Sequence, residues 1–235
     1  MGFDAVRLCT INARGGSKGV PGKNLIQING VPLIAHSIRQ AQNSGLFEFV
    51  AVSSDSIDIL NVARDFGAIA IDRPHDLAGD QSPKVPAIAH CVSNVEQQLD
   101  CRFDFIVDLD ATSPLRSLDD ISGVVNLLES GLYDSVFTAT ASRRSPFFNQ
   151  VWMDPLGRWG PVLRGHTSYS RRQDTPQTFD MNASIYGWKR DALLEKQAVF
   201  FDNTAMFLMP EERSWDIDSE FDLKIVKFLM ESREN

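Results

Sequence analysis

Short apolar runs alternate with segments of helical periodicity along most of this chain, and this alternation limits the folds that it can adopt. The apolar runs are bounded by turn residues and predict buried strands at about 6–13, 49–53, 68–72, 103–109, 135–140 and 182–188. The amphipathic segments between them predict helices at about 32–45, 57–66, 85–99 and 118–130, with a last helix inside 216–230. Strands that alternate with helices pair into a largely parallel sheet with helices on both faces. The pattern therefore predicts an α/β fold.

Composition narrows the class of protein further. At 235 residues, the chain has the size of one large α/β domain spanning 1–235. Its formal charge of −8 argues against a general nucleic-acid or membrane-surface binder, because such proteins need broad positive fields. Three cysteines without CxxC or zinc spacing, and the lack of a signal-peptide pattern, lead us to expect a reduced cytoplasmic protein without a membrane segment.

A glycine-rich basic loop follows the first expected strand. It reads Arg14-Gly15-Gly16-Ser17-Lys18-Gly19-Val20-Pro21-Gly22-Lys23-Asn24 and contains three cations and no acid. Glycines let the backbone turn tightly and bring N–H groups against a ligand, and cations beside such amides make an anion site. The alternative is a solvated Gly/Pro turn. The position straight after the first strand favours a polyphosphate site.

Carboxylates stand at two further points where a parallel sheet places its ligands. Asp110 follows the strand expected at 103–109, and a carboxylate there suits Mg²⁺, which binds hard oxygens and bridges phosphates. Asp216 and Asp218 precede the last helix and, two residues apart in an extended segment, point the same way. Each has an ordinary alternative: a turn carboxylate for Asp110, and a helix N-cap made by Asp218 or Ser219.

The alternation stops between 142 and 180, where arginines and aromatic residues mix with Pro and Gly. This composition lacks helical periodicity and predicts a β-rich excursion from the core. An exposed hairpin rich in aromatic residues more often binds a partner, so we expect a dimerisation element rather than a simple surface flap.

A triphosphate site beside carboxylates implies nucleotidyl transfer, in which a nucleophile attacks the α-phosphate and pyrophosphate leaves. Arg14, Lys18 and Lys23 neutralise the triphosphate in this interpretation, while Asp110 and Asp218 hold the metal. Two other nucleotide-binding motifs are absent from the sequence, the Gly-x4-Gly-Lys-Ser/Thr of P-loop NTPases and a GxGxxG after the first strand.

Four blocks, in the same order along nearly the whole chain, resemble the signature of the CMP-sialic acid synthetases (acylneuraminate cytidylyltransferases). They are Ile11–Gly19 with Lys23-Asn24, Thr112–Arg116, Asn182–Tyr186 and Asp216–Leu223. The resemblance implies a Rossmann-like, three-layer, mostly parallel sheet of the nucleotide-diphospho-sugar transferase type. It also implies dependence on Mg²⁺ and a homodimer whose protruding element, here 142–180, reaches the active site of the partner.

Matched motif by motif, the resemblance implies three groups of contacts. Contacts to CTP fall on Arg14, Gly15, Gly16, Ser17, Lys18, Lys23 and Asn24, with Arg73 near the cytosine and Lys84 near the nucleotide, where relatives often have a small polar residue. The metal carboxylates are Asp216 and Asp218. The sugar-site positions are Arg172, Asn182, Tyr186, Phe200 and Phe201.

Two departures from this family concern the sugar. Asp110-Ala111 replaces a typical Gln-Pro, which adds a metal-capable carboxylate, and Asp180-Met181 replaces a frequent Arg-Pro. These blocks look most like enzymes that activate legionaminic acid, with sialic acid or pseudaminic acid as alternative substrates. Remoter alternatives are a glycosyltransferase with Asp108-Leu109-Asp110 as its DxD motif and a non-catalytic nucleotide-binding regulator. The catalytic base stays open between Asp110, a metal-bound hydroxide and solvent.

Overall fold

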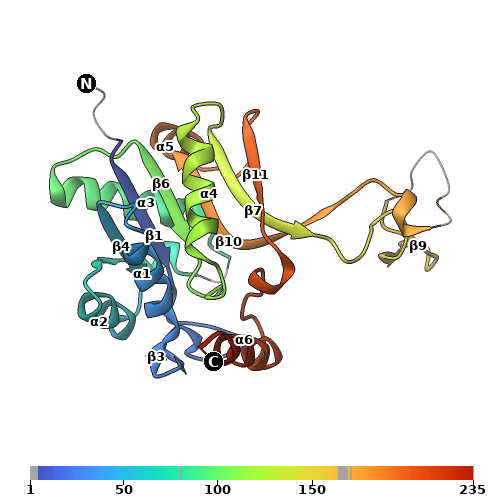
Figure 1. Cartoon of the computed structure of the whole chain (residues 1–235), viewed down its shortest axis with the longest axis horizontal. Coiled ribbons are helices and arrows are strands. Elements are labelled where there is room, and N and C mark those ends of the chain that lie inside the picture. Colours follow the sequence, from blue (N-terminus) through green and yellow to red (C-terminus); the bar gives the residue numbers. More distant parts are fainter. Residues whose placement is uncertain (1–4, 80, 164–168, 170, 235) are drawn as a thin grey trace.

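A seven-stranded sheet forms the centre of the molecule (Figure 1). The computed structural model describes residues 5–79, 81–163, 169 and 171–234. The strand order is β11-β7-β10-β6-β1-β4-β5, and β10 is the strand that runs antiparallel to both of its neighbours. The strands are β1 (Arg7–Asn12), β4 (Phe49–Ser54), β5 (Ile69–Asp72), β6 (Phe105–Leu109), β7 (Ser135–Ala141), β10 (Phe179–Lys189) and β11 (Thr204–Leu208).

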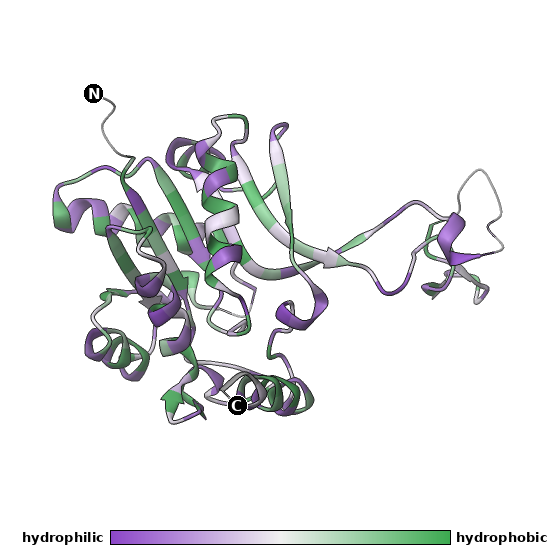
Figure 2. Cartoon of the chain, in the orientation of Figure 1, coloured by the Kyte–Doolittle hydropathy of each residue, from purple (hydrophilic) through white to green (hydrophobic). Residues whose placement is uncertain are grey.

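Helices cover both faces of the sheet, as the alternating pattern predicts. Hydrophobic residues concentrate in the strands and on the helix sides that face them (Figure 2). One core joins the sheet to α1 (Leu33–Ser44), α2 (Ile57–Asp65) and α4 (Leu118–Glu129). A second core joins the opposite face to α3 (Lys84–Leu99) and α5 (Arg190–Lys196). Because neighbouring residues of β1 and β6 enter different cores, both faces of these strands are buried.

A small third core lies outside the sheet and joins the basic loop to the C-terminal helix α6 (Glu220–Glu234). Val20 of the loop packs there with Ile217 and with Leu223 and Val226 of α6. A short hairpin, β2 (Gln27–Ile28) and β3 (Val31–Pro32), closes this core through Ile28, and Figure 1 shows it beside α6. The third core thus fixes the loop and the segment before α6 against each other.

The segment between β7 and β10 leaves the body as an arm (Figure 1). Its elements are the two-stranded β8 (Val151–Met153) and β9 (Trp159–Pro161) and the short helix η3 (Arg172–Asp174). Many of its apolar side chains are exposed, among them Phe148, Val151, Trp152, Met153, Leu156 and Trp159. Residues 164–168 and 170 of the predicted excursion at 142–180 lie outside the described residues.

The α/β class and the mostly parallel sheet are confirmed, with several differences in detail. The strand predicted at 103–109 begins at Phe105, because the Phe103 N–H donates to Glu96 Oε1 of α3 (3.1 Å) and not to a neighbouring strand. Helix α5 and strand β11 were not predicted, since each is too short to show a clear period. The cysteines are unpaired as expected, and no described helix is long and apolar enough to cross a membrane.

Gly123 of α4 faces the ring of Phe207 on β11, and a Cβ atom there would overlap that ring. We predict that Gly123→Ala lowers the free energy of unfolding by about 1–3 kcal/mol, because overpacking outweighs a gain of about 1 kcal/mol in helix propensity. Urea denaturation measures the change. Asn126→Ala, on the exposed side of the same helix, is the control and should stay within about 0.5 kcal/mol of the wild type. A Gly123→Ala protein as stable as the wild type would contradict this packing.

Candidate functional site

Two neighbouring depressions lie at the carboxyl ends of β1 and β6, and they share Asn12, Arg14 and Asp110. This is the edge at which parallel sheets bind ligands. The first depression is lined by the predicted loop and carboxylates, including Ser17, Lys18, Lys23, Asn24, Asp216 and Asp218. The second is lined by Arg73, Lys84 and the segment around Gly79 and Pro83. The structure therefore brings the predicted nucleotide and metal residues to one edge of the sheet.

The basic loop and the acidic segment before α6 are in direct contact. Lys23 Nζ donates to the Ile217 carbonyl (2.5 Å) and to Asp218 Oδ1 (3.1 Å). Gly19 passes so close to the Asp218 carbonyl that a Cβ atom at residue 19 would overlap it. Glycine at this position is thus required by the close approach of the two backbones. Cations and carboxylates predicted from distant parts of the sequence form one site.

Part of the loop is held by the protein itself. The Gly15 N–H donates to Asp55 Oδ1 (2.8 Å), so this amide shapes the loop instead of pointing at a ligand. The buried side chain of Asn24 donates to the Arg14 carbonyl (3.1 Å). Its Oδ1 atom is buried and accepts no hydrogen bond from the described residues. Asn24 therefore braces the loop, and its Oδ1 atom is a buried acceptor that the described residues leave unpaired.

Arg73 is anchored at the ends of β1 and β4. Its guanidinium donates to Ser53 Oγ (3.1 Å), to the Ser53 carbonyl (2.8 Å) and to Asn12 Oδ1 (2.8 Å). Burial lowers its pKa from the usual value, although the group stays cationic. Arg14, opposite it in the same depression, donates to the Gly79 carbonyl (3.4 Å). The depression between them is walled by guanidinium groups.

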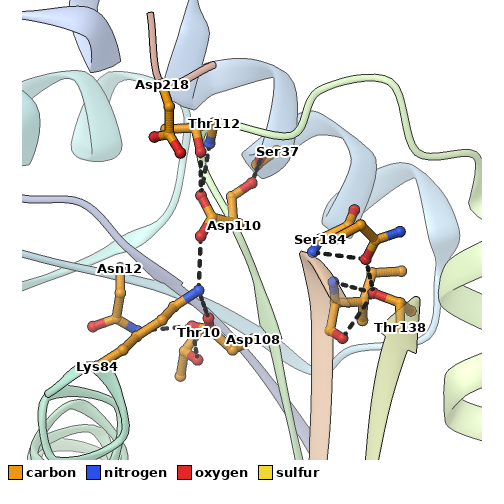
Figure 3. Close-up of polar contacts among 12 residues, drawn as sticks. Thr10, Asn12, Ser37, Lys84, Asp108, Asp110, Thr112, Thr138, Ser184 and Asp218 are labelled. Carbon is orange, nitrogen blue, oxygen red and sulfur yellow. Dashed lines mark hydrogen bonds and ion pairs between the residues drawn. The ribbon is translucent and has the colours of Figure 1, made fainter. Parts of the chain in front are cut away.

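Lys84 lies between two aspartates of the β6 end (Figure 3). Its Nζ atom is 2.9 Å from Asp108 Oδ2 and 2.8 Å from Asp110 Oδ2. Asp108 is fully buried, and its Oδ1 atom accepts from Thr10 and Asn12, both at 2.8 Å. Burial works against the charge of Lys84, but both aspartates raise its pKa above the usual value. Lys84 is therefore the counter-ion of a buried acidic pair.

Asp110 is held firmly in its charged form. Its Oδ1 atom accepts from the backbone N–H and the hydroxyl of Thr112, each at 2.8 Å. Burial alone would raise the pKa of Asp110, but Lys84 and the hydrogen bonds from Thr112 hold it well below the usual range. An acid with so low a pKa is a poor general base. Any ion that bound the oxygen facing Lys84 would have to displace that lysine.

Asp216 and Asp218 face each other as a like-charged pair. Burial, and then the charge of Asp218, raise the pKa of Asp216 to about 6. The helix cap that sequence alone left open for Asp218 is made by Ser219, whose hydroxyl accepts from the Asp222 N–H (3.2 Å) while Asp222 Oδ2 accepts from the Ser219 N–H (2.8 Å). The Asp218 carboxylate thus remains in the site, beside Lys23.

This donor set fits Mg²⁺ bound partly through phosphate. Among the residues that the structure describes, no three His, Cys, Asp or Glu side chains enclose a metal-sized position. Mg²⁺ is typically held by one or two carboxylates together with substrate phosphates, rather than by a complete protein cage. Asp216 and Asp218 repel each other and lie next to the cationic loop, so they match that description. Asp110 influences Asp216 only through its charge.

The sugar-site predictions are brought together only in part. Asn182 and Tyr186 lie on β10, where a bulge between Met181 and Tyr186 holds Ala183 at φ 51°. The Asn182 amide is already used, since it donates to Ser214 (2.9 Å) and accepts from Thr138 (2.6 Å). Tyr186 is half-buried and lies 5.1 Å from Lys84 Nζ, measured to its ring centre. Asn182 thus shapes the strand, and Tyr186 faces the lysine.

Three predicted sugar contacts lie away from this edge within one chain. Arg172 is on the arm, where it donates to the Ser142 carbonyl (2.8 Å). Phe201 packs into the second core and lines a depression with Arg102 and Phe105, at the opposite end of β6. Phe200 is exposed and contacts the edge of Phe137. A role for these residues in the site stays a prediction that needs a second chain.

Sequence reasoning missed two buried charges that build the site. Asp108 entered it only as part of a DxD motif, although a lone acid inside an apolar strand signals a buried ion pair. Arg116 is fully enclosed and donates to Ser184 (3.1 Å), to Ser37 (3.0 Å) and to the Asp110 carbonyl. Burial lowers its pKa to about 10. It fixes the backbone from which the Asp110 side chain projects.

Comparisons with known proteins bear on the family of this chain. A family model described as cytidylyltransferase matches residues 8–221. The CMP-N,N'-diacetyllegionaminic acid synthase of Campylobacter jejuni is 43% identical over 224 residues, covering 95% of this chain and 94% of the relative. The post-translational flagellin modification protein B of Campylobacter coli is 41% identical over 228 residues, covering 96% and 95%. A pseudaminic acid cytidylyltransferase of Campylobacter jejuni is 31% identical over 230 residues, covering 94% and 95%.

The fold has a counterpart among solved structures. The structure of a CMP:2-keto-3-deoxy-manno-octonic acid synthetase in complex with CTP superposes with a TM-score of 0.72 and 18% identity, covering 97% of this chain and all of the other. At this identity, the match bears on the fold alone. The family match over most of the chain and the relatives above 40% identity carry the assignment: the chain belongs to the cytidylyltransferase family.

Proposed function

We propose that this protein transfers CMP from CTP to a nine-carbon 2-keto sugar acid and releases pyrophosphate. The observation that carries this proposal is the contact between the cationic loop and the Asp216–Asp218 segment, through Lys23. Relatives named for legionaminic and pseudaminic acid support the sugar class. Legionaminic acid is the favoured substrate, with pseudaminic acid and sialic acid as alternatives.

The basic loop and the residues of the two depressions divide the work on CTP. Arg14, Lys18 and Lys23 neutralise the triphosphate, with Gly16 and Ser17 lining its path, and Arg73 faces the base. Asp216 and Asp218 hold Mg²⁺, which when bound offsets the charge that develops on the phosphates. The loop therefore orients the α-phosphate and stabilises the pyrophosphate that leaves.

The anomeric hydroxyl of the sugar acid is the nucleophile. Its oxygen forms a bond to the α-phosphorus, and the bond between this phosphorus and the bridging oxygen of pyrophosphate breaks. The hydroxyl proton goes to solvent, because the low pKa of Asp110 makes that carboxylate a weak acceptor. Asp110 instead holds Lys84 through an ion pair and fixes the turn after β6 through its hydrogen bonds with Thr112.

The arm completes the sugar site in a homodimer. The apolar residues of its described part are exposed and extend away from the body, and a second chain would supply a surface that covers them. In such a dimer Arg172, Phe200 and Phe201 of one chain reach the sugar bound to the other. Residues 142–180 are thus the dimerisation and substrate-capping element of a single domain, 1–235. A cytoplasmic location, where CTP is available, stays a prediction.

A glycosyltransferase built on Asp108-Leu109-Asp110 fits the structure poorly. Asp108 is fully buried and bound to Thr10, Asn12 and Lys84, so it presents no carboxylate to a sugar nucleotide. A non-catalytic nucleotide-binding regulator is the remaining alternative. It predicts CTP binding without turnover.

A sugar panel separates these possibilities. Purified protein with CTP and Mg²⁺ is offered legionaminic, pseudaminic and sialic acid, and pyrophosphate release is measured for each. We expect release with at least one of these acids and the highest kcat/KM for legionaminic acid. CTP binding without release for any of them would support the regulator instead.

We predict that Asp218→Asn lowers kcat by at least about 100-fold while the protein stays folded, because a metal-binding carboxylate is lost. Glu220→Gln is the matched control, since it removes an exposed carboxylate two residues away and should retain most activity. Steady-state pyrophosphate release at saturating Mg²⁺ measures both. Near wild-type turnover in Asp218→Asn would remove Asp218 from the metal site.

Asp216 gives a prediction for stability against pH in metal-free buffer. Its folded pKa of about 6 exceeds the unfolded value of about 3.9, so the folded protein binds this proton more tightly. The stability that protonated Asp216 contributes is therefore lost as the pH rises from about 4 to about 6, and the ionised side chain lowers the free energy of unfolding above this range. We expect Asp216→Asn to exceed the wild type in unfolding free energy by about 1 kcal/mol at pH 7, allowing for screening, with the difference vanishing at low pH. Urea titrations at several pH values test this, and a pH-independent difference would contradict it.

The arm gives a prediction for the oligomeric state. Trp152 of β8 and Trp159 of β9 lie on the hairpin opposite Gly160 and Met153, and they are 48% and 69% exposed. We expect the wild type to be a dimer, and the double variant Trp152→Ser/Trp159→Ser to be monomeric, because the apolar contact is lost. Light scattering after gel filtration measures the mass. Leu132→Ser, equally exposed on the body at 69%, is the control and should stay dimeric. A monomeric wild type would refute the dimer.

A further inference from the structure

The oxygens around Lys84 converge on one point at the end of β6 (Figure 3). In Asp108, Oδ1 is held by the neutral donors Thr10 and Asn12, and Oδ2 is left to face Lys84. In Asp110, Oδ1 is held by Thr112, and Oδ2 faces Lys84 from the other side. Two carboxylates that face the same point repel each other, and a cation between them offsets this repulsion.

The place of Lys84 in its helix is unfavourable for a cation. It is the first residue of α3, whose first turn contains no acidic residue. The N-terminus of a helix carries partial positive charge and repels an ammonium group. The side chain is also two-thirds enclosed, at 33% exposure, and its head lies over the Tyr186 ring. Within the described surroundings, the two aspartates and the face of the Tyr186 ring are what stabilise a lysine here.

We propose that the Lys84 ammonium is a built-in cation that occupies the position a divalent ion would otherwise take between Asp108 and Asp110. Lys84 is then a positioning residue, and it keeps Asp110 in one place whether or not Mg²⁺ is present. Divalent metal binds only on the other side of the first depression, at Asp216 and Asp218. This inference deepens the proposed function and rests on it, because it assumes that the protein uses a divalent metal.

The difference in contact lengths gives the proposal its test. An ammonium group sits 2.8–2.9 Å from these oxygens, whereas Mg²⁺ would need oxygens at about 2.0–2.1 Å and would pull the two carboxylates closer. Both cannot occupy the same point. Removing the ammonium should therefore open a new divalent site, and keeping it should block that site.

The experiment counts Mn²⁺ ions bound per chain by electron paramagnetic resonance, without CTP or sugar. We expect Lys84→Ser to bind about one Mn²⁺ more than the wild type, because a cation position between two carboxylates is vacated. Lys84→Arg keeps the charge and should gain none. Adding Asp110→Asn to Lys84→Ser should remove the gain. The melting temperature of Lys84→Ser should rise on addition of Mn²⁺ by more than that of the wild type.

A folded Lys84→Ser protein that gains no Mn²⁺ would overturn the proposal. If that variant does not fold, Asp110→Asn and Asp218→Asn in the otherwise wild-type chain decide. An unchanged Mn²⁺ count in Asp110→Asn, beside a reduced count in Asp218→Asn, supports the proposal, and a reduced count in Asp110→Asn overturns it. None of these counts depends on turnover, so failure of the proposed function would show separately, as absent pyrophosphate release.

Discussion

The small core shared by Val20 and Ile217 is the contact on which the rest of the site depends. It joins a loop that follows the first strand to a segment that precedes the last helix, and Lys23 reaches Asp218 across 195 positions of the sequence. Neither segment could hold a triphosphate alone, because one supplies cations and the other carboxylates. Apolar packing brings the two together, and the close passage of Gly19 beside Asp218 leaves little freedom in their relative position.

Buried charge is the second constraint, and it is balanced locally within a chain of formal charge −8. Arg73 and Arg116 are enclosed and bind mainly neutral oxygens, whereas Lys84 binds two carboxylates. Each cation is attached to the end of a strand or the start of a helix. Rigid elements therefore carry the electrostatics of the site, which reduces the reorganisation that catalysis requires.

Sequence alone could predict the local features and not the distant partners. Strands and helices that face a core have a regular spacing of hydrophobic residues, so the sequence predicts most of them. Lys23 and Asp218 can be recognised because each belongs to a sequence motif. Helix α5 and strand β11 are too short for that signal. Lys84 was placed near the nucleotide, but its pairing with Asp108 depends on where α3 begins relative to β6. Arg172 and Phe200 lie away from the site edge of the sheet within one chain, so their proposed contact with the sugar rests on the proposed dimer.

The strand β10 lies between two halves of the sheet with different tasks. On one side, β6, β1, β4 and β5 run parallel and carry the loop, Arg73 and Asp110 at their ends. On the other side lie β7 and β11, and the arm with its exposed aromatic residues connects β7 to β10. Under the proposed function, the nucleotide belongs to the first half and the sugar mainly to the second. Evolution can therefore exchange one sugar acid for another by altering β10 and the arm, while the chemistry performed on CTP is inherited unchanged.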